Sequence, residues 1–267
     1  MIKKAIKNFN LQTIADSGQC FRMEPESADT YRVIAHGRVL RITAGPGDSF
    51  AFDTDEEEFK NLWEEYFDLK TDYSEYIRAI PASDEFLTAA AAYGEGIRIL
   101  RQEPFETLIT FIISQRKNIP AIKKCVEELS LRFGERIAGD LHAFPTPEAL
   151  FHASAEELGE CHLGYRTEYV RRAAERVYRG EVNLSELCKL NDNDLFDALL
   201  SFHGVGKKVA NCVMLFAYHR IAAFPIDVWI ERVINEKYSG SFPVENYEGF
   251  AGVIQQYMFY YGRTQGV

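Results

Sequence analysis

A glycine-rich turn, two lysines and a cysteine lie within residues 199–212, which read LLSFHGVGKKVANC. The pattern predicts an apolar helix, a turn at 204–206 and a second helix that begins with the lysines. Because residues four positions apart share a helix face, we expect Lys208 and Cys212 to lie together. A lysine amine is a nucleophile only when it is deprotonated, which requires a desolvated or cationic setting. The spacing alone leaves two interpretations open, a nucleophile or an ordinary surface lysine.

The turn itself has the chemistry of a phosphate-binding loop. Gly204 and Gly206 flank Val205, so the backbone can turn tightly and approach a partner closely. The amide hydrogens at the start of the next helix point outward, which suits a phosphate. Lys207 is expected either to contact a phosphate or to be solvated. The alternative for the turn is a tight connection between two helices without a ligand.

An aspartate with catalytic potential follows about twenty residues later, in the run FPIDVW at residues 224–229. Pro225 favours an extended conformation for the residue before it, and Asp227 precedes an apolar helix, where aspartate is a good N-cap. Capping and catalysis are compatible, because backbone amides keep such a carboxylate ionised and aimed.

The elements that must position these residues are of two kinds. Residues 31–35 and 38–42 read as strands joined by a turn at His36-Gly37, and residues 50–52 resemble a third strand. An acidic run then leads into an amphipathic helix. The side chains expected to face inward there are Phe59, Leu62, Trp63 and Phe67.

From about residue 84 onward nearly every segment reads as a helix. The sequence therefore predicts an α+β fold, with a small N-terminal antiparallel sheet domain packed on a helical domain. The expected boundaries are 1–83 for the sheet domain with its flanking helices and 84–267 for the helical domain. The hairpin of two helices is expected at about 194–218. The predicted helices cover 105–114, 121–133, 155–158, 168–178, 192–200, 207–218, 228–238 and 247–261.

Composition excludes several classes of protein. The 267 residues are 46% apolar and 26% charged, which is ordinary for a globular chain. No stretch approaches the roughly 18 consecutive apolar residues of a membrane span, so we expect no membrane association. The start, MIKKAIKNFNLQ, has no continuous apolar run or cleavage site, which predicts a cytoplasmic protein.

The five cysteines argue against a disulfide framework, a structural zinc site and an iron–sulfur cluster. Their number is odd, their spacings are wide and no CxxC pair occurs. Most are expected to be small buried groups, with Cys212 as the exception. The others are Cys20, Cys125, Cys161 and Cys188.

The net charge of −10 argues against non-specific binding to nucleic acid. Basic residues nevertheless cluster at 116–124, 166–179 and 207–208, so they are predicted to form one local basic face, with the acids of 53–68 turned away. The alternative is that many of these residues form ion pairs along helix surfaces.

Taken together, the motifs resemble the helix-hairpin-helix DNA glycosylases that carry a catalytic lysine. Three further segments are similar to signatures of the 8-oxoguanine DNA glycosylase family: an N-terminal signature, a Gly-Tyr-Arg segment at the DNA kink and a C-terminal base-reading helix. The five segments follow the family's order over nearly the whole chain. They are 17–22, 163–166, 204–210, 225–228 and 250–259.

This resemblance implies a bifunctional base-excision repair enzyme. The damaged nucleotide would be flipped out of the duplex, since its glycosidic carbon cannot be reached in the stack. Lys208 would attack C1′, displace the base and form a Schiff base, and β-elimination would then nick the strand. Asp227 would stabilise the positive charge that develops on the sugar. No metal is implied, although such hairpins can hold a structural monovalent cation.

The resemblance also implies a pocket for the base. Gln255 and Phe259 are four residues apart, so both would face one cavity, where the glutamine amide suits the Watson–Crick edge of a purine. Phe259 and Cys212 would sandwich the base. The carbonyl of Gly18 would accept a hydrogen bond from N7–H, which 8-oxoguanine has and guanine lacks. The alternatives are a core aromatic for Phe259 and a solvated helix residue for Gln255.

Several expected DNA contacts depart from the animal and fungal pattern. Tyr165 beside Arg166 suits an aromatic wedge that replaces the stacking of the flipped base. In the family, an asparagine stretch and an arginine hold the cytosine opposite the lesion. Residues 115–118 stand in place of that stretch and Ala121 in place of the arginine, so we expect a looser preference for an opposite cytosine. Trp229 stands where a phosphate-contacting histidine is expected. The residues expected to contact DNA are Gln115, Arg116, Tyr165, Arg166, Gly204, Val205, Gly206, Lys207 and Trp229.

Three hypotheses about function follow. The first is an 8-oxoguanine glycosylase/lyase that acts as a monomer on double-stranded DNA containing the lesion, associated with the nucleoid of a prokaryote. The second is a lysine-type glycosylase for other oxidised bases, as in endonuclease III, against which the missing cysteine cluster and the N-terminal sheet count. The third is a non-catalytic hairpin module that only grips the DNA backbone. Such a module needs neither Lys208 nor Asp227 nor Gln255.

Overall fold

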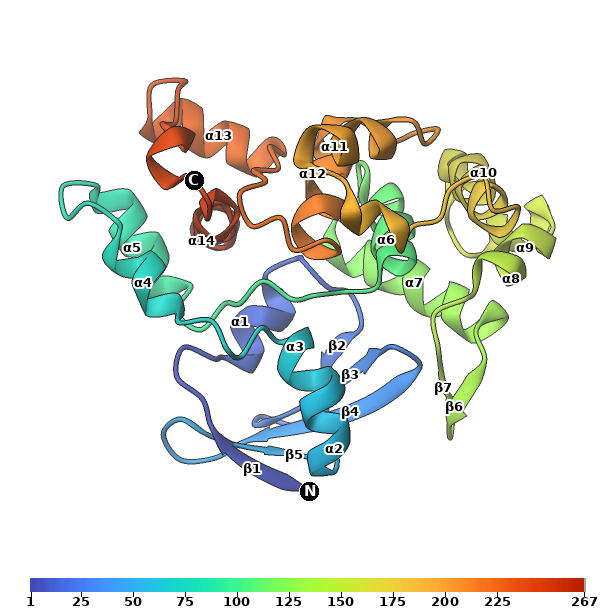
Figure 1. The fold of residues 1–267 in the computed structure, drawn as a ribbon, viewed down its shortest axis with the longest axis horizontal. Coiled ribbons are helices and arrows are strands. Elements are labelled where there is room, and N and C mark those ends of the chain that lie inside the picture. Colours follow the sequence, from blue (N-terminus) through green and yellow to red (C-terminus); the bar gives the residue numbers. More distant parts are fainter. Residues whose placement is uncertain (267) are drawn as a thin grey trace.

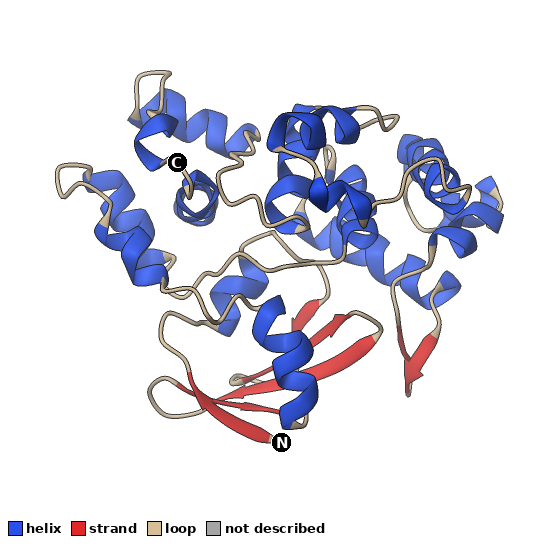
Figure 2. Ribbon diagram, viewed as in Figure 1, coloured by secondary structure: helices blue, strands red, loops and turns tan. Residues whose placement is uncertain are grey.

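The computed structural model of the protein describes residues 1–266. Its N-terminal part is an antiparallel sheet of five strands in the order β1-β5-β4-β3-β2, and the rest of the described chain is mostly helical (Figures 1 and 2). The predicted α+β fold is confirmed. The strands are β1 (Ile2–Ala5), β2 (Met23–Pro25), β3 (Thr30–Ala35), β4 (Arg38–Ala44) and β5 (Ser49–Phe52).

The hairpin between β3 and β4 turns at His36 and Gly37, as predicted. Both residues have positive φ angles, 52° and 66°, which is the geometry of the two-residue turns that match the twist of paired strands. Glycine adopts this conformation without strain, and histidine is among the residues that tolerate it.

The sheet buries one face because apolar side chains alternate along its strands. In β4, Leu40 and Ile42 are fully buried while Arg41 between them is exposed. The buried face forms a core with α1 (Leu11–Asp16) and with the helical segment at 56–66. That segment consists of α2 (Glu56–Glu58), the π-helical turn η1 (Phe59–Trp63) and α3 (Glu64–Tyr66).

The helical part follows most of the predicted ranges, with some differences. The helix expected at 247–261 begins only at Ala251, since Gly249 has a φ of 86°, outside the helical region. The elements outside the predicted ranges include β1, β2 and α1, and also α4 (Tyr73–Arg78), β6 (Arg136–Ala138), β7 (Leu141–His142) and α8 (Pro147–His152). The other helices are α5 (Glu85–Tyr93), α6 (Pro104–Ser114), α7 (Ile119–Phe133), α9 (Ala155–Glu160), α10 (Thr167–Tyr178), α11 (Asp192–Leu200), α12 (Lys207–Phe216), α13 (Val228–Lys237) and α14 (Ala251–Gln265), with short 3₁₀ turns at Gly164–Arg166, Glu186–Lys189 and Val244–Tyr247.

The segment between α1 and β2 is anchored to the chain that enters the helical part. The Gln19 side chain donates to the carbonyl of Arg98 and accepts from the amide of Leu100, both at 2.8 Å. Gln102 returns a hydrogen bond from its Nε2 to the carbonyl of Gln19 at 2.8 Å. These bonds fix the backbone position of Gly18. The boundary between residues 83 and 84 stays a prediction.

Within residues 1–266, no helix has the length and apolar character needed to span a bilayer. The same residues contain no group of three or more His, Cys, Asp or Glu side chains arranged to hold a metal ion. The cysteines are free thiols, of which Cys188 is exposed and the others are buried.

Candidate active site

One small cavity, of about 40 Å³, brings together the residues that the sequence analysis singled out for catalysis and base binding. Its wall is built from the segment after α1, the helices α6, α12 and α14, and the residues just before α13. Figure 1 shows α12, α14 and α1 converging near the centre of the molecule. The predicted residues in the wall are Gly18, Lys208, Cys212, Asp227, Gln255 and Phe259.

Lys208, the second residue of α12, is half-buried at the edge of this cavity. Its Nζ donates a hydrogen bond to Oγ of Ser114 at 3.2 Å and lies 5.0 Å from the ring centroid of Phe111. The Ser114 hydroxyl donates to the Phe111 carbonyl at 2.8 Å, so its lone pairs remain available to Lys208. The amine is thus held in place over an aromatic ring, unlike an ordinary surface lysine.

Cys212 lies one helical turn after Lys208 and is 3% exposed. Burial raises the pKa of its thiol to about 11, against the lowering influence of the Lys208 ammonium. The sulfur is therefore a neutral, polarizable part of the wall at neutral pH and does not compete with Lys208 as a nucleophile.

Asp227 caps the N-terminus of α13, as predicted. Its Oδ1 accepts hydrogen bonds from the backbone amides of Trp229 and Ile230 at 3.0 and 2.9 Å. The carboxylate is half-buried in the cavity wall. Two amide donors fix its orientation.

Gln255 is 3% exposed, so its interpretation as a solvated helix residue is wrong. Its Nε2 donates to the carbonyl of Pro225 at 3.0 Å, and its Oε1 accepts from Nε2 of Gln256 at 3.0 Å. The amide group is therefore held firmly, with one lone pair of its oxygen left for a ligand.

Phe259 closes the cavity against Gly18, which has a φ of 74°. A Cβ atom on Gly18 would lie 3.0 Å from Cε1 of Phe259 and 3.2 Å from Cδ1 of Ile119. Glycine is required here both by the backbone conformation and by the close approach of the ring.

The hairpin between α11 and α12 depends on a second close approach. Gly204 has a φ of 83°, and a Cβ atom there would fall 2.4 Å from the ring of Tyr169. Gly206 precedes α12 as its N-cap, is exposed and has open space around it. Val205 is buried between them. The turn therefore combines a packed glycine with an accessible one.

Gln115 joins three segments that were expected to contact DNA. Its Nε2 donates to the carbonyls of Ile112 and Gly204 at 3.1 and 3.0 Å. Its own carbonyl accepts from Nε of Arg166 at 2.9 Å and also from Nη2 of the same residue. Arg166 is only 6% exposed. Both side chains face the protein here, so a contact with a base requires them to reorient.

Tyr165 has the exposure that a wedge needs. Its side chain is 53% exposed, and the Arg166 guanidinium lies 4.3 Å from its ring centroid. Arg116 and Lys207 are also exposed, and Arg116 has a φ of 53°. Trp229 is half-buried, with the Arg232 guanidinium 5.0 Å from its ring centroid.

The arginines of α10 contribute less to a basic face than their number suggests. Most of them form ion pairs three or four residues away along the helix, which confirms the alternative interpretation for this segment. The pairs are Arg171 with Glu168 and Glu175, Arg172 with Glu168, and Arg179 with Glu175.

Five wall residues, and Ser114, which contacts Lys208, were not singled out from the sequence. Ser114 holds Lys208, but nothing in its local sequence marks it, since it simply ends an apolar helix. The four-residue spacing that pairs Gln255 with Phe259 does not include Gln256. The others are Ser17, Phe111, Phe216 and Pro225.

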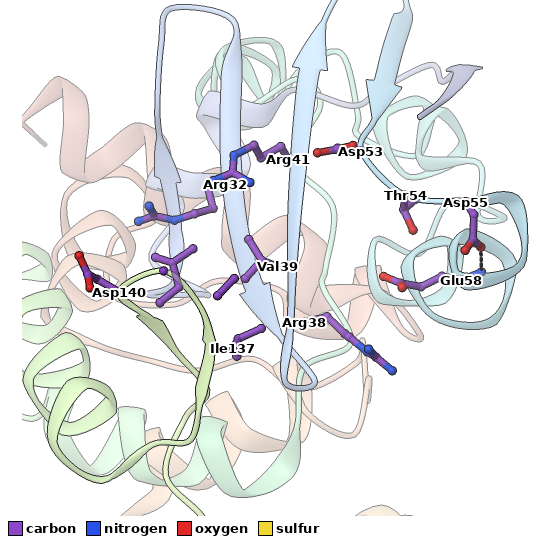
Figure 3. Close-up of a pocket in the computed structure, with 13 residues that line it drawn as sticks. Arg32, Arg38, Val39, Arg41, Asp53, Thr54, Asp55, Glu58, Ile137 and Asp140 are labelled. Carbon is purple, nitrogen blue, oxygen red and sulfur yellow. Dashed lines mark hydrogen bonds between the residues drawn. The ribbon is translucent and has the colours of Figure 1, made fainter.

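A larger hollow, of about 670 Å³, lies on the outer face of the sheet beside the β6–β7 hairpin (Figure 3). Two of its arginines, Arg32 and Arg41, form ion pairs with Glu26, and Asp55 accepts a hydrogen bond from the backbone amide of Glu58. None of the predicted catalytic or base-binding residues lines this hollow, so the chemistry is placed in the smaller cavity.

Comparisons with known proteins identify the family of the chain. Residues 1–108 match the 8-oxoguanine DNA glycosylase N-terminal domain, and residues 109–241 match the HhH-GPD superfamily base excision DNA repair proteins. A solved structure of MBOgg1 with a low affinity DNA ligand is 37% identical, with a TM-score of 0.94, and the match covers 99% of this chain and 96% of that one.

Two further relatives extend the comparison. The Clostridium acetobutylicum 8-oxoguanine glycosylase/lyase, solved with double-stranded DNA containing cytosine opposite 8-oxoguanine, is 38% identical with a TM-score of 0.92, over 98% of this chain and 94% of that one. A probable N-glycosylase/DNA lyase of Methanothermobacter thermautotrophicus is 27% identical over 75% of this chain and 74% of its own length.

The fold and the cavity define a helix-hairpin-helix protein of base excision DNA repair. The chain belongs to the 8-oxoguanine DNA glycosylase family.

Proposed function

We propose that this chain excises 8-oxoguanine from duplex DNA with Lys208 as nucleophile and then nicks the abasic strand. The observation that carries the proposal is the half-buried Lys208 amine, held by Ser114 at the edge of a cavity that Gln255 and Phe259 also line. The enzyme is a bifunctional DNA N-glycosylase and lyase, in agreement with the activity named for its relatives.

In the proposed reaction, the deprotonated Nζ of Lys208 forms a bond with C1′ as the bond from C1′ to the base nitrogen breaks. The electron pair of that bond leaves with the base. The positively charged nitrogen formed at C1′ gives one proton to the departing base and a second to the ring oxygen O4′ as the C1′–O4′ bond breaks, which leaves a Schiff base between Lys208 and C1′. Loss of a C2′ proton breaks the bond from C3′ to its phosphate oxygen, which nicks the strand. Every step is a polar one and balances without an oxidant or reductant.

Asp227 acts on the charge that this reaction develops. Its carboxylate is fixed by two backbone amides beside the cavity that also holds Lys208. A fixed anion stabilises the positive charge on the sugar without reorganising during the step. The same negative charge orients the protonated form of Lys208 before reaction.

The cavity must open to receive a base. A cavity needs about 10–15 Å³ of accessible volume to hold one water molecule. The cavity of about 40 Å³ therefore has room for a few waters and not for a purine. The ring of Phe259 is the movable part of the wall, because Gly18 opposite it belongs to an anchored backbone segment. We expect Phe259 to swing aside and then cover the base.

The finer points of the proposal concern partners and conditions. The proposed substrate is double-stranded DNA containing 8-oxoguanine, with the base read by Gly18, Cys212, Gln255 and Phe259. We propose that the protein acts as a monomer, in the cytoplasm and associated with the nucleoid of a prokaryote. The proposed chemistry needs no metal cofactor, and the hairpin offers a place for a structural monovalent cation.

Borohydride trapping on a duplex with one 8-oxoguanine tests the proposal. Reduction of the Schiff base should give a covalent adduct that mass spectrometry locates at Lys208. Lys208→Gln should abolish the adduct while damaged DNA is still bound. Lys207→Gln is the matched control, since Lys207 is the adjacent but exposed lysine, and it should keep the adduct.

The same duplex should be prepared with each of the four bases opposite the lesion. Because Ala121 and the 115–118 segment lack the groups that would hold a cytosine, excision rates are expected to differ by less than tenfold among the four. Absence of an adduct with all four duplexes, in folded and DNA-binding protein, would contradict the proposal. It would favour another oxidised base or a hairpin protein without catalysis.

A further inference from the structure

Gln256, a residue of the active-site cavity wall, has a buried hydrogen-bonding atom without a partner. The residue follows Gln255 on α14, lines the same cavity and is 3% exposed. Its Oε1 is buried and has no hydrogen-bond partner within residues 1–266. A buried acceptor without a partner costs about 1–3 kcal/mol, so a structural role alone does not account for it.

The backbone carbonyl of Pro225 sets the orientation of the Gln256 side-chain amide, through the side chain of Gln255. The carbonyl of Pro225 can only accept, so Gln255 must turn its Nε2 toward it. Oε1 of Gln255 then faces Gln256, which must in turn present its own Nε2. The chain of amides therefore has one direction, and it ends with Oε1 of Gln256 as an acceptor.

The result is a pair of side-chain carbonyl oxygens on two adjacent residues of the cavity wall. Oε1 of Gln255 uses one lone pair for Gln256 and retains the other, while Oε1 of Gln256 retains both. On the edge of a guanine-type base, N1–H and the exocyclic 2-amino group are two adjacent donors. Adenine-type bases offer an acceptor at N1 and no amine at C2, so they do not match this pair.

We propose that Oε1 of Gln256 accepts a hydrogen bond from the exocyclic 2-amino group of the flipped 8-oxoguanine, next to the N1–H that Gln255 receives. This inference rests on the proposed function and adds a second base-reading residue to it. Entry of the base satisfies the buried acceptor, so part of the selectivity for guanine-type lesions comes from an atom left unpaired in the empty site.

Two substrates and three proteins test the proposal. Single-turnover base release is measured on duplexes with 8-oxoguanine and with 8-oxoinosine, which lacks only the 2-amino group. The wild-type protein should release 8-oxoguanine at least about 10-fold faster, since the analogue leaves the acceptor unpaired. In Gln256→Met, release of 8-oxoguanine should fall about 10- to 100-fold and the ratio between the substrates should approach one.

Tyr257→Phe is the matched control. The Tyr257 hydroxyl is also buried on α14 without a partner among the described residues, but Tyr257 does not line the cavity. This variant should keep the wild-type ratio between the substrates. Nicking of a preformed abasic site, where no base enters the pocket, should be unchanged in Gln256→Met and shows that the variant is folded.

The outcomes separate the inference from the function on which it rests. A wild-type protein that releases no 8-oxoguanine contradicts the proposed function itself. A wild-type protein that releases both bases at equal rates overturns the role of Gln256, and so does a Gln256→Met variant that keeps the wild-type ratio. Equal slowing of both substrates in the variant would mean that Gln256 only supports the helix, which also overturns the inference.

Discussion

Asp227 combines two tasks that substitution can separate. Its Oδ1 caps α13 through two backbone amides, and its charge faces the cavity that holds Lys208. Asparagine caps helices about as well as aspartate does but carries no charge. Asp227→Asn should therefore keep the melting temperature within about 2 °C and lower single-turnover base release about 100-fold or more, by loss of the fixed anion.

Asp227→Ala is the comparison variant. Loss of the cap should destabilise the protein by about 1 kcal/mol, measured by denaturant unfolding, in addition to the loss of activity. Asparagine and alanine variants with the same stability would contradict the capping role. An asparagine variant with the wild-type rate of base release would contradict the electrostatic one.

The spacing of residues along a helix predicts some of the residues at this site and misses others. The i, i+4 rule placed Lys208 with Cys212 and Gln255 with Phe259 on the wall of one cavity, because it depends only on helix geometry. Gln256 and Ser114 could not be found in this way. Their contacts depend on the Pro225 carbonyl and on the approach of α6 to α12, which only the packed structure defines.

At the scale of elements, the hairpin turn should respond differently to alanine at its two glycines. At Gly204, a Cβ atom meets the Tyr169 ring at 2.4 Å, and the backbone has a φ of 83°. Gly204→Ala should destabilise the protein by about 1–3 kcal/mol and weaken DNA binding about 10-fold or more, because the turn must move. Thermal unfolding and fluorescence anisotropy with duplex DNA measure the two effects.

Gly206→Ala provides the matched control for stability. No atom lies within 4 Å of a Cβ there, and Gly206 has an extended φ of −99°. Its melting temperature should equal that of the wild type, while DNA binding weakens if a phosphate approaches this backbone. Equal melting temperatures for the two alanine variants would contradict the packing argument at Gly204.

Elements with strong local signals were predicted well, and short edge elements were not. In β3 and β4, apolar and polar residues alternate, and a two-residue turn joins the strands. Their pairing can therefore be predicted from neighbouring residues in the sequence. The strand β1 consists of four residues, and its Ile2 pairs with Phe52 of β5, far along the chain. Such an edge strand forms because the sheet is already present, and the hairpin of β6 and β7 is similarly short.

At the scale of the whole molecule, a buried ionic cluster around Asp68 connects the sheet side to the helix that carries Lys208. Asp68 follows α3 and accepts from the hydroxyl of Tyr73 at 3.0 Å. It also lies 3.1 Å from Nη2 of Arg101 and 3.4 Å from Nε2 of His219, which comes just after α12. The two parts of the molecule are thus coupled by charge as well as by apolar packing.

This cluster predicts a specific dependence of stability on pH. Burial alone would raise the pKa of Asp68, but the hydrogen bond and charge of His219, with hydrogen bonds from Thr71 and Arg101, lower it below its usual range. A carboxylate whose pKa is lower in the folded state stabilises that state fully above its unfolded pKa of about 3.9. The contribution is lost as the pH falls through the lower, folded value.

Asp68→Asn should therefore destabilise the protein by about 1–3 kcal/mol at pH 7, where the buried partners lose their anion. The difference in melting temperature between the variant and the wild type should shrink below about pH 4, as the wild-type carboxyl takes up a proton. Asp53→Asn, at an exposed position, should match the wild type throughout. A difference between Asp68→Asn and the wild type that persists unchanged at pH 3 would mean that packing, rather than charge, couples the two parts of the molecule.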